Sequence, residues 1–348
     1  MKKIIVFIYS LVHLVVDLAC AVLVKKLVTP NTENELVLFI AVVLYNFFAF
    51  AIQFPIGIMA DKINKNGIVA LVGCMMVAFA YLFSNFALIP CIIAGLGNAM
   101  YHIGSGIDVL NISDKKASLS GIYISTGALG IFLGSSQDVT IFNGYRMVFL
   151  LIISAIIIKI LYDKIKDKVI NEEIIIPMIN KNEKIIIICL MITVIIRSYM
   201  GFILAFEWKK DFYLEFIATL ALIFGKMFGG IIGDKIGFLK ISIFSLLISS
   251  IGFILAFNNW IIGCIAILFF NMTMPITLTA LVNLLPNNKG MAFGLLTFAL
   301  FLGSMPVFFG YGELLFNKPG LLLITIVSML VLYIGINNYN KEIEKKNG

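Results

Sequence analysis

Long runs of apolar residues follow one another along the chain, separated by short connections that hold charged residues, proline, asparagine and glycine. A helix needs about 20 apolar residues to cross roughly 30 Å of hydrocarbon, and many windows reach that length. Strands of a membrane barrel would alternate polar and apolar residues, and these windows do not alternate. The pattern therefore predicts an all-α protein with many membrane-spanning helices.

Cutting the sequence at these connections predicts twelve spans. They cover residues 4–24, 36–59, 67–84, 87–107, 118–137, 146–161, 185–206, 212–232, 239–257, 260–284, 290–311 and 320–337. The one long connection, 162–184, is rich in lysine and glutamate, which predicts a flexible cytoplasmic linker. We therefore expect an N-terminal six-helix bundle over 1–161 and a C-terminal six-helix bundle with a short cytoplasmic tail over 185–348.

Composition agrees with a membrane protein, because 61% of the 348 residues are hydrophobic and only 13% are charged. The basic and then apolar N-terminus could begin a signal peptide, but no small-residue cleavage site follows and another span comes at once. The five cysteines fall inside apolar windows without metal-ligand or CxxC spacing, so we expect them to pack as small apolar residues.

The net charge of +7 is better explained by orientation than by nucleic acid. If the N-terminus is inside, the connections on its side hold 18 lysines, against 6 basic residues on the opposite side. Both termini are therefore predicted to be cytoplasmic in a multi-pass protein of the cytoplasmic membrane.

Two charged connections repeat each other. The first, Gly57 to Gly67, reads GIMADKINKNG, and the second, Gly230 to Lys240, reads GIIGDKIGFLK. Aligning Asp61 with Asp234 gives an offset of 234 − 61 = 173 residues, almost half the chain. A repeat at this spacing predicts two related, pseudo-symmetric halves.

With these two loops in a twelve-span pattern, the chain resembles the major facilitator superfamily over essentially its whole length. The superfamily's signature loop between helices two and three runs Gly-x-Leu-Ala-Asp-Arg-x-Gly-Arg-Lys, with a weaker copy between helices eight and nine. The first copy is matched at Gly57, Ala60, Asp61, Lys62 and Lys65, with Asn64 in place of the second glycine; the second is matched at Gly230, Asp234, Lys235, Ile236 and Gly237. The resemblance implies the major facilitator fold and transport by alternating access.

Three shorter stretches are similar to the fosmidomycin-resistance-like efflux group. His13 and Asp17 fit that group's His-x-x-Asn-Asp pattern in helix one, where Val16 replaces asparagine. The stretch GLGNAMYHIGSG places Tyr101 and His102 on its Phe-His-Pro pattern, with Ile103 in place of proline. The stretch STGALGIFLGS keeps the glycines of its fifth helix, with departures at Thr126 and Ser135. The resemblance implies efflux of a small organic molecule.

Ionisable groups in hydrocarbon cost at least a few kcal/mol each, so the mid-span ones are candidates for function. His13 and Asp17 are four residues apart, on one helix face, and could take and release a proton; a packing hydrogen bond is the alternative. His102 is either a further proton carrier or a satisfied packing residue. Asp108 lies near it, at a membrane edge where its carboxylate could equally be solvated.

In the C-terminal half, Arg197 near the middle of span seven and Lys226 in span eight would attract an anionic substrate group or pair with Asp17. Lys226 could instead extend to the cytoplasmic surface. Gln53 and Asn271 would hydrogen-bond to substrate or join helices to one another. Pro275 could interrupt its helix and provide a gating point.

The sequence has no HExxH, P-loop or GxSxG motif, so we expect no enzyme, cofactor or metal site. Without an ATP-binding domain, active transport would use an ion gradient, and the histidines and Asp17 favour protons. The prediction is a monomeric secondary transporter whose partners are a small-molecule substrate, protons and membrane lipids, with no nucleic acid. Proton-coupled efflux is favoured, uptake of a small anionic metabolite is the alternative, and a transporter-like receptor or membrane enzyme is a third.

The resemblance also gives the charged loops a role as a conformational latch. Asp61 would accept hydrogen bonds from the N-terminus of span eleven near Gly290, where the helix dipole favours negative charge. The repeat predicts that Asp234 does the same for span five near Ser118. Lys62 and Lys65 would hold the first loop inside the cell.

Overall fold

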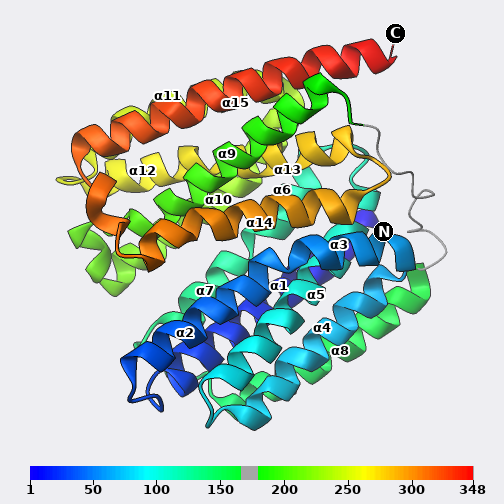
Figure 1. Ribbon diagram of the computed structural model, residues 1–348, viewed down its shortest axis with the longest axis vertical. Helices are drawn as coiled ribbons and strands as arrows, with labels where there is room; N and C mark the ends of the chain where they lie inside the picture. Colours follow the sequence, from blue (N-terminus) through cyan, green and yellow to red (C-terminus); the bar gives the residue numbers. More distant parts are fainter. Residues whose placement is uncertain (166–178, 348) are drawn as a thin grey trace. The chain divides into compact units, whose positions relative to one another are not determined.

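A computed structural model describes residues 1–165 and 179–347, whose secondary structure is entirely helical. The first helices are α1 (Lys2–Val22), continued by π-helical Leu23–Val28, α2 (Glu35–Asn46), continued by π-helical Phe47–Ala51, α3 (Gln53–Ile63), α4 (Asn66–Ala80), α5 (Leu88–Ile112), α6 (Ala117–Ser125), α7 (Gly127–Ser135) and α8 (Gly144–Ile165). The later ones are α9 (Lys181–Ile203), α10 (Phe212–Ile236), α11 (Phe238–Leu255), α12 (Trp260–Asn271), α13 (Thr273–Leu284), α14 (Lys289–Phe308) and α15 (Lys318–Asn347) (Figure 1). Short 3-10 turns stand at Tyr81–Phe83, Glu207–Lys210 and Gly312–Leu315.

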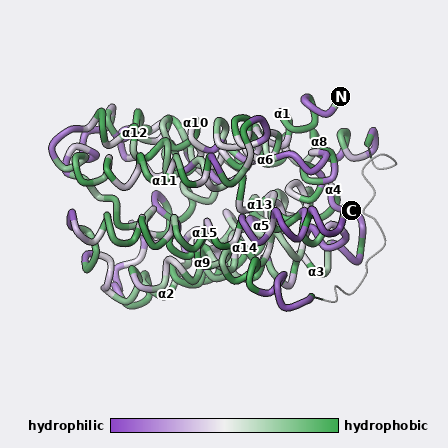
Figure 2. The backbone as a smooth tube through the Cα atoms, turned by 90° about the horizontal axis from the view of Figure 1, so that it is seen from above, coloured by the Kyte–Doolittle hydropathy of each residue, from purple (hydrophilic) through white to green (hydrophobic). Residues whose placement is uncertain are grey.

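Within the described residues, eleven helical segments are long and apolar enough to cross a membrane. The 22 residues of α8 have the length of a twelfth. Hydrophobic colouring follows most of the helical lengths (Figure 2). The prediction of an all-α, multi-pass membrane protein is confirmed.

The helices group into two compact units. Unit 1 holds Met1–Asp114, the chain from Tyr123 through α8, and Asn287–Phe298. Unit 2 holds Lys115–Ile122, the chain from α9 to Pro286, and the residues from Ala299 onward. The first turns of α6 therefore belong to unit 2, and the first turns of α14 belong to unit 1.

Most of the predicted linker, 166–178, lies outside the described residues. Its first residues, 162–165, continue α8, and its last ones begin α9 with a capping box. In this box the Asn180 side chain accepts from the Glu183 backbone, and the Glu183 carboxylate accepts from the Asn180 backbone. The two ends of the connection are therefore helical.

Two predicted spans contain a break that the hydrophobic pattern does not show. The span over 118–137 divides at Thr126, whose hydroxyl donates to the carbonyl oxygens of Ser10 and Tyr123 and so competes with the helix backbone. The span over 260–284 divides at Met272, just before Pro275, which has no backbone N–H to continue the helix. Pro275 therefore stands in the first turn of α13.

Glycines of α7 let it approach α1 closely in unit 1. A Cβ on Gly130 would stand 2.3 Å from the carbonyl oxygen of Leu14, and one on Gly134 would stand 2.6 Å from the Cβ of Ala21. Small residues permit such contact between membrane helices. This contact brings the start of α7 beside His13 and Asp17.

The left-handed backbone after α3 explains why asparagine can replace the signature glycine. Asn64 ends α3 with a φ of 51°, a conformation that asparagine tolerates better than most residues. At the repeat offset of 173, the matching residue is Gly237, which ends α10 with a φ of 101°. Both copies of the loop therefore stop their helix with a residue suited to positive φ.

Candidate functional site

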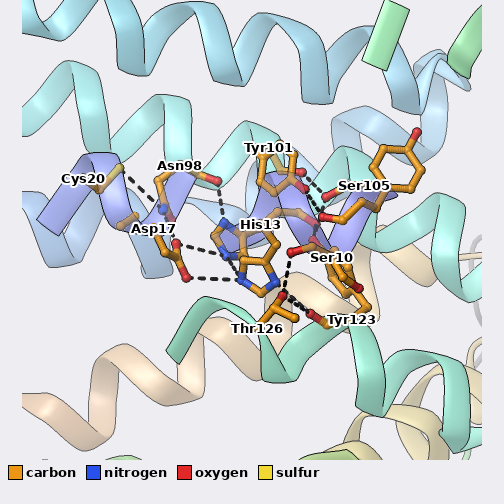
Figure 3. Close-up of polar contacts among 12 residues, drawn as sticks. Ser10, His13, Asp17, Cys20, Asn98, Tyr101, Ser105, Tyr123 and Thr126 are labelled. Carbon is orange, nitrogen blue, oxygen red and sulfur yellow. Dashed lines mark hydrogen bonds and ion pairs between the residues drawn. The ribbon is translucent and has the colours of Figure 1, made fainter. Parts of the chain in front are cut away.

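Residues of unit 1 that come from four helices form a polar cluster in an apolar interior. His13 and Asp17 stand one turn apart on α1, and His102 comes from α5, where Asn98 stands one turn before it. The end of α6 places Tyr123 beside the ring of His13 (Figure 3). The start of α7 closes the cluster with Gly127. Asp17 is about nine-tenths buried, and His13 more so. We call His13, Asp17 and His102 the HDH cluster.

The three ionisable groups of the HDH cluster are in direct contact. The Nε2 atoms of His13 and His102 are 2.8 Å apart. Asp17 Oδ2 lies 3.2 Å from Nε2 of His13, and Asp17 Oδ1 lies 3.6 Å from Nε2 of His102. Asn98 donates to Asp17 Oδ1 at 2.9 Å, which fixes the carboxylate.

Hydrogen-bond partners fix where the hydrogens of the cluster must be. Nδ1 of His13 faces the carbonyl oxygen of Tyr123 at 2.8 Å, and Nδ1 of His102 faces that of Asn98 at 2.8 Å. A carbonyl oxygen can only accept, so both Nδ1 atoms carry hydrogen. The Nε2–Nε2 contact then needs one more hydrogen between the rings, which makes them an imidazole and an imidazolium beside one carboxylate.

Gly127 forms one wall of the cluster. A Cβ at this position would stand 2.2 Å from Asp17 Oδ2 and 2.5 Å from Nε2 of His13. Real Cβ atoms do not approach so closely, so any side chain here would displace the ionisable groups. Glycine at the start of α7 is therefore a requirement of the HDH cluster as well as of helix packing.

Asp108 belongs to a different buried site, which lies closer to the C-terminal end of α5 than His102 does. Tyr9 donates to its Oδ2 at 2.6 Å, and Asn66 donates to its Oδ1 at 3.0 Å. Only 2% of its surface is exposed, so the solvated alternative is wrong. Its partners join α1, α4 and α5 inside unit 1.

Arg197 in unit 2 is a buried cation held by neutral partners. Its guanidinium donates to the hydroxyls of Thr273 and Thr277 at 3.2 Å each, and these threonines share one face of α13. No described carboxylate of unit 2 forms an ion pair with it, and its Nε has no partner among the described residues. The proposed pair with Asp17 joins residues of different units and stays a prediction.

The other predicted binding residues, Lys226, Gln53 and Asn271, have buried side chains. Lys226 on α10 is 9% exposed, which disagrees with extension to the surface. Gln53 donates to the Ala49 carbonyl, and Asn271 donates to the Ile267 carbonyl, each within one helical segment. Gln53 Oε1 has no partner among the described residues of the chain.

The latch contacts implied by the resemblance are present in both units. In unit 1, Asp61 Oδ1 and Oδ2 accept from the backbone N–H groups of Gly290 at 2.8 Å and Met291 at 2.9 Å. In unit 2, Asp234 accepts from those of Ala117 at 2.7 Å and Ser118 at 2.9 Å. Lys62, Lys65 and Lys235 are exposed and take no part in these contacts.

The same offset of 173 also relates the backbone donors of the two helix-end contacts, since 290 − 117 and 291 − 118 both equal 173. Gly57 and Gly230 match as well: a Cβ on Gly57 would stand 2.1 Å from the Gly290 carbonyl oxygen, and one on Gly230 would stand 2.3 Å from that of Ala117. The sequence repeat therefore corresponds in the structure to a pair of equivalent helix-end contacts.

The HDH cluster breaks this repeat. The residues 173 positions after His13, Asp17 and His102 are Ile186, Leu190 and Pro275. Asn98 matches Asn271, and Gln53 matches Lys226. The two halves therefore share these helix-end contacts and differ in their buried ionisable groups.

Sequence reasoning missed the residues that support the candidate groups. Asn98 and His102 are four apart on one helix face, a spacing that could have linked Asn98 to the cluster. Thr273 and Thr277 have the same spacing. The contacts of Tyr123 and Gly127 have no such signal, because they depend on how α6 and α7 pack beside α1.

No protein-family model and no curated protein sequence matches the chain. Solved structures do resemble it: the major facilitator superfamily transporter FucP in the outward conformation has a TM-score of 0.68 at 13% identity, covering 96% of this chain and 98% of that one. A bacterial homologue of the iron transporter ferroportin, outward-facing, has a TM-score of 0.64 at 12% identity, covering 97% and 98%. The human organic anion transporter MFSD10 has a TM-score of 0.64 at 11% identity, covering 97% and 99%. The chain therefore has the major facilitator fold.

Proposed function

We propose that the chain is a secondary active transporter that couples proton movement to a small organic molecule by alternating access. The observation that carries this proposal is the HDH cluster, because buried ionisable groups are costly and are retained in membrane helices for ion and substrate movement. A neutral cluster with one shared hydrogen can lose and regain it as access changes from one side of the membrane to the other. A structural neighbour, the Escherichia coli FucP, is a fucose:proton symporter, which supports the coupling ion.

The substrate side of the proposal places an anionic group at Arg197. Among the described residues, two hydroxyls hold the buried guanidinium, which keeps donor capacity for a carboxylate or a phosphonate and binds such groups in a forked geometry. A protein of similar structure, human MFSD10, is an organic anion transporter. Lys226, Gln53 and Asn271 would add polar contacts, and the resemblance to the fosmidomycin-resistance-like group favours efflux over uptake.

The remaining parts of the proposal concern the orientation of the chain in the membrane and the change between its open states. The excess of lysine in one set of connections supports cytoplasmic termini in the cytoplasmic membrane. Asp61 and Asp234 would act as latches, because each carboxylate binds the N-terminus of a helix that must move if that side of the protein opens. A monomer is sufficient for this mechanism.

Proteoliposomes that hold the purified chain test the coupling, with fosmidomycin as the anionic probe. An acidic lumen drives accumulation by an antiporter, whereas an alkaline lumen drives accumulation by a symporter, so the sign of the gradient reports the direction. Asp17→Asn should abolish gradient-driven accumulation and keep exchange of labelled for unlabelled probe. Asp138→Asn, which changes an exposed aspartate of unit 1, is the matched control. Full gradient-driven accumulation in Asp17→Asn would show that the HDH cluster does not couple transport.

A further inference from the structure

The HDH cluster has the donor set of a transition-metal site. Its two Nε2 atoms and the Asp17 carboxylate lie within 4.8 Å of one another and come from two helices. These are the only two histidines of the chain, 89 residues apart in sequence, which is why sequence spacing predicted no metal site. We propose that this cluster binds one divalent transition-metal ion of the zinc class, with ligands His13, Asp17 and His102.

The outer hydrogen bonds orient both imidazoles as metal ligands. Each Nδ1–H donates to a backbone carbonyl oxygen, from His13 to Tyr123 and from His102 to Asn98. This second contact is what metal-binding histidines usually make, since it fixes the ring and directs the Nε2 lone pair to the ion. Asn98 similarly holds Asp17 Oδ1. The ligands are therefore oriented before any ion arrives.

The distances between ligand atoms are close to those that an ion requires. Tetrahedral zinc with bonds of about 2.0–2.1 Å separates its ligand atoms by roughly 3.3 Å. The separations here are 2.8 Å between the two Nε2 atoms, 3.2 Å from Nε2 of His13 to Asp17 Oδ2, and 3.6 Å from Nε2 of His102 to Asp17 Oδ1. Opening the Nε2–Nε2 contact by about 0.5 Å, together with a turn of the carboxylate that brings one oxygen toward both rings, would meet the zinc geometry. Rotation of the two rings can supply this change.

The charge and the wall of the site fit the same assignment. The Nε2 atoms can face each other only with a cation between them, which is either one hydrogen ion or a metal ion. A Cβ on Gly127 would stand 2.2 Å from Asp17 Oδ2 and 2.5 Å from Nε2 of His13, so only glycine lets α7 pack against these two ligands without displacing them. Three protein ligands leave a fourth position for water or a substrate oxygen.

The donor types select the class of ion. Two imidazoles and one carboxylate suit Zn²⁺, Co²⁺ and Ni²⁺, whereas Mg²⁺ and Ca²⁺ prefer sites made of oxygen ligands alone. The inference goes beyond the proposed function, because it requires the site to bind metal whether or not the chain moves protons. Metal and the shared hydrogen occupy the same place, so each excludes the other.

Metal binding to the purified protein in detergent tests the inference, with a purification tag that contains no histidine. After chelation and dialysis at a fixed neutral pH, titration with Zn²⁺ should show about one ion per chain, and Co²⁺ should give a tetrahedral visible spectrum. Zn²⁺ should also raise the unfolding temperature of the wild type, and Mg²⁺ should not. These wild-type measurements need no variant to fold.

Variants then locate the ion. His13→Gln, His102→Gln and Asp17→Asn should each weaken Zn²⁺ binding by about a hundredfold or more, because even outer-shell changes cost about 10–100-fold. Gly127→Ala should weaken it comparably while keeping all three ligands. Asp108→Asn, at another buried carboxylate of unit 1, and Cys20→Ala, at the thiol beside Asn98, should bind Zn²⁺ as the wild type does.

Two results would overturn the inference: no saturable Zn²⁺ binding by the wild type, or unchanged binding in the His13→Gln, His102→Gln double variant. The proton-coupling proposal is tested separately by transport in the presence of a chelator. Zn²⁺ binding without gradient-driven transport would support the metal site and oppose proton coupling. Gradient-driven transport without Zn²⁺ binding would support proton coupling and overturn the metal site.

Discussion

Replacing Asp61 with asparagine tests whether the first latch contact holds the start of α14. Asp61 accepts from the N–H groups of Gly290 and Met291, at 2.8 and 2.9 Å. These groups lie in the first turn of α14, where backbone N–H groups have no partner inside the helix. The carboxylate is therefore their acceptor and a favourable charge at the positive end of the helix dipole.

The size of the effect follows from these two bonds. Asparagine keeps one acceptor oxygen and loses the second acceptor and the charge. A hydrogen bond to a charged group contributes about 1.5–3 kcal/mol, so Asp61→Asn should weaken the contact by about 2–3 kcal/mol. At about 1.4 kcal/mol per factor of ten, amide exchange at Gly290 and Met291 should become roughly 30 to 150 times faster.

Hydrogen–deuterium exchange with mass spectrometry measures this directly on peptides that cover Asn287–Phe298. Lys62→Gln is the matched control, since Lys62 is the exposed neighbour of Asp61 and forms no part of the contact. Its exchange at the start of α14 should equal that of the wild type. Equal exchange in Asp61→Asn and wild type would refute the latch contact, and faster exchange in both variants would show that the loop acts through its overall charge.

Two further predictions concern the other half. Asp234→Asn should accelerate amide exchange at Ala117 and Ser118 by a similar factor, because Asp234 makes the equivalent pair of hydrogen bonds at 2.7 and 2.9 Å. Unchanged exchange at these two amides would show that Asp234 does not hold its helix end as Asp61 does. Arg197→Gln should weaken binding of an anionic probe such as fosmidomycin by roughly 10 to 150 times, the worth of one charge-assisted hydrogen bond. Titration calorimetry checks this against Lys210→Gln, an exposed lysine of unit 2, and equal affinity in the two variants would remove Arg197 from the substrate site.

Much of the fold followed from residue patterns that act locally. Apolar runs of about 20 residues set the helices, because unpaired backbone groups in hydrocarbon leave a helix as the available structure. The charged loops set the repeat, since a difference of 173 between Asp61 and Asp234 holds for the helix ends they contact. The interruptions at Thr126 and Met272 were harder to see, because they change hydrogen bonding without changing hydropathy.

The candidate site was predictable only in part. The spacing of four residues between His13 and Asp17 places them together on any helix, and the structure shows them 3.2 Å apart. The sequence placed His102 near Asp108 on the same span. The structure instead joins His102 to His13 across two helices and gives Asp108 its own partners, Tyr9 and Asn66. The choice between these partners depends on helix rotation.

The sequence by itself determined the membrane helices, the repeat and the helix ends, because hydrophobic length, loop charge and left-handed stops act over a few neighbouring residues. Only the tertiary structure decided that the two histidines and Asp17 share one small space, since helix packing brings α5 and α7 against α1. The same packing closed that space with Gly127 and placed the carbonyl oxygens that fix both imidazoles. Atoms 89 residues apart in sequence meet at 2.8 Å, and no local pattern sets such a distance.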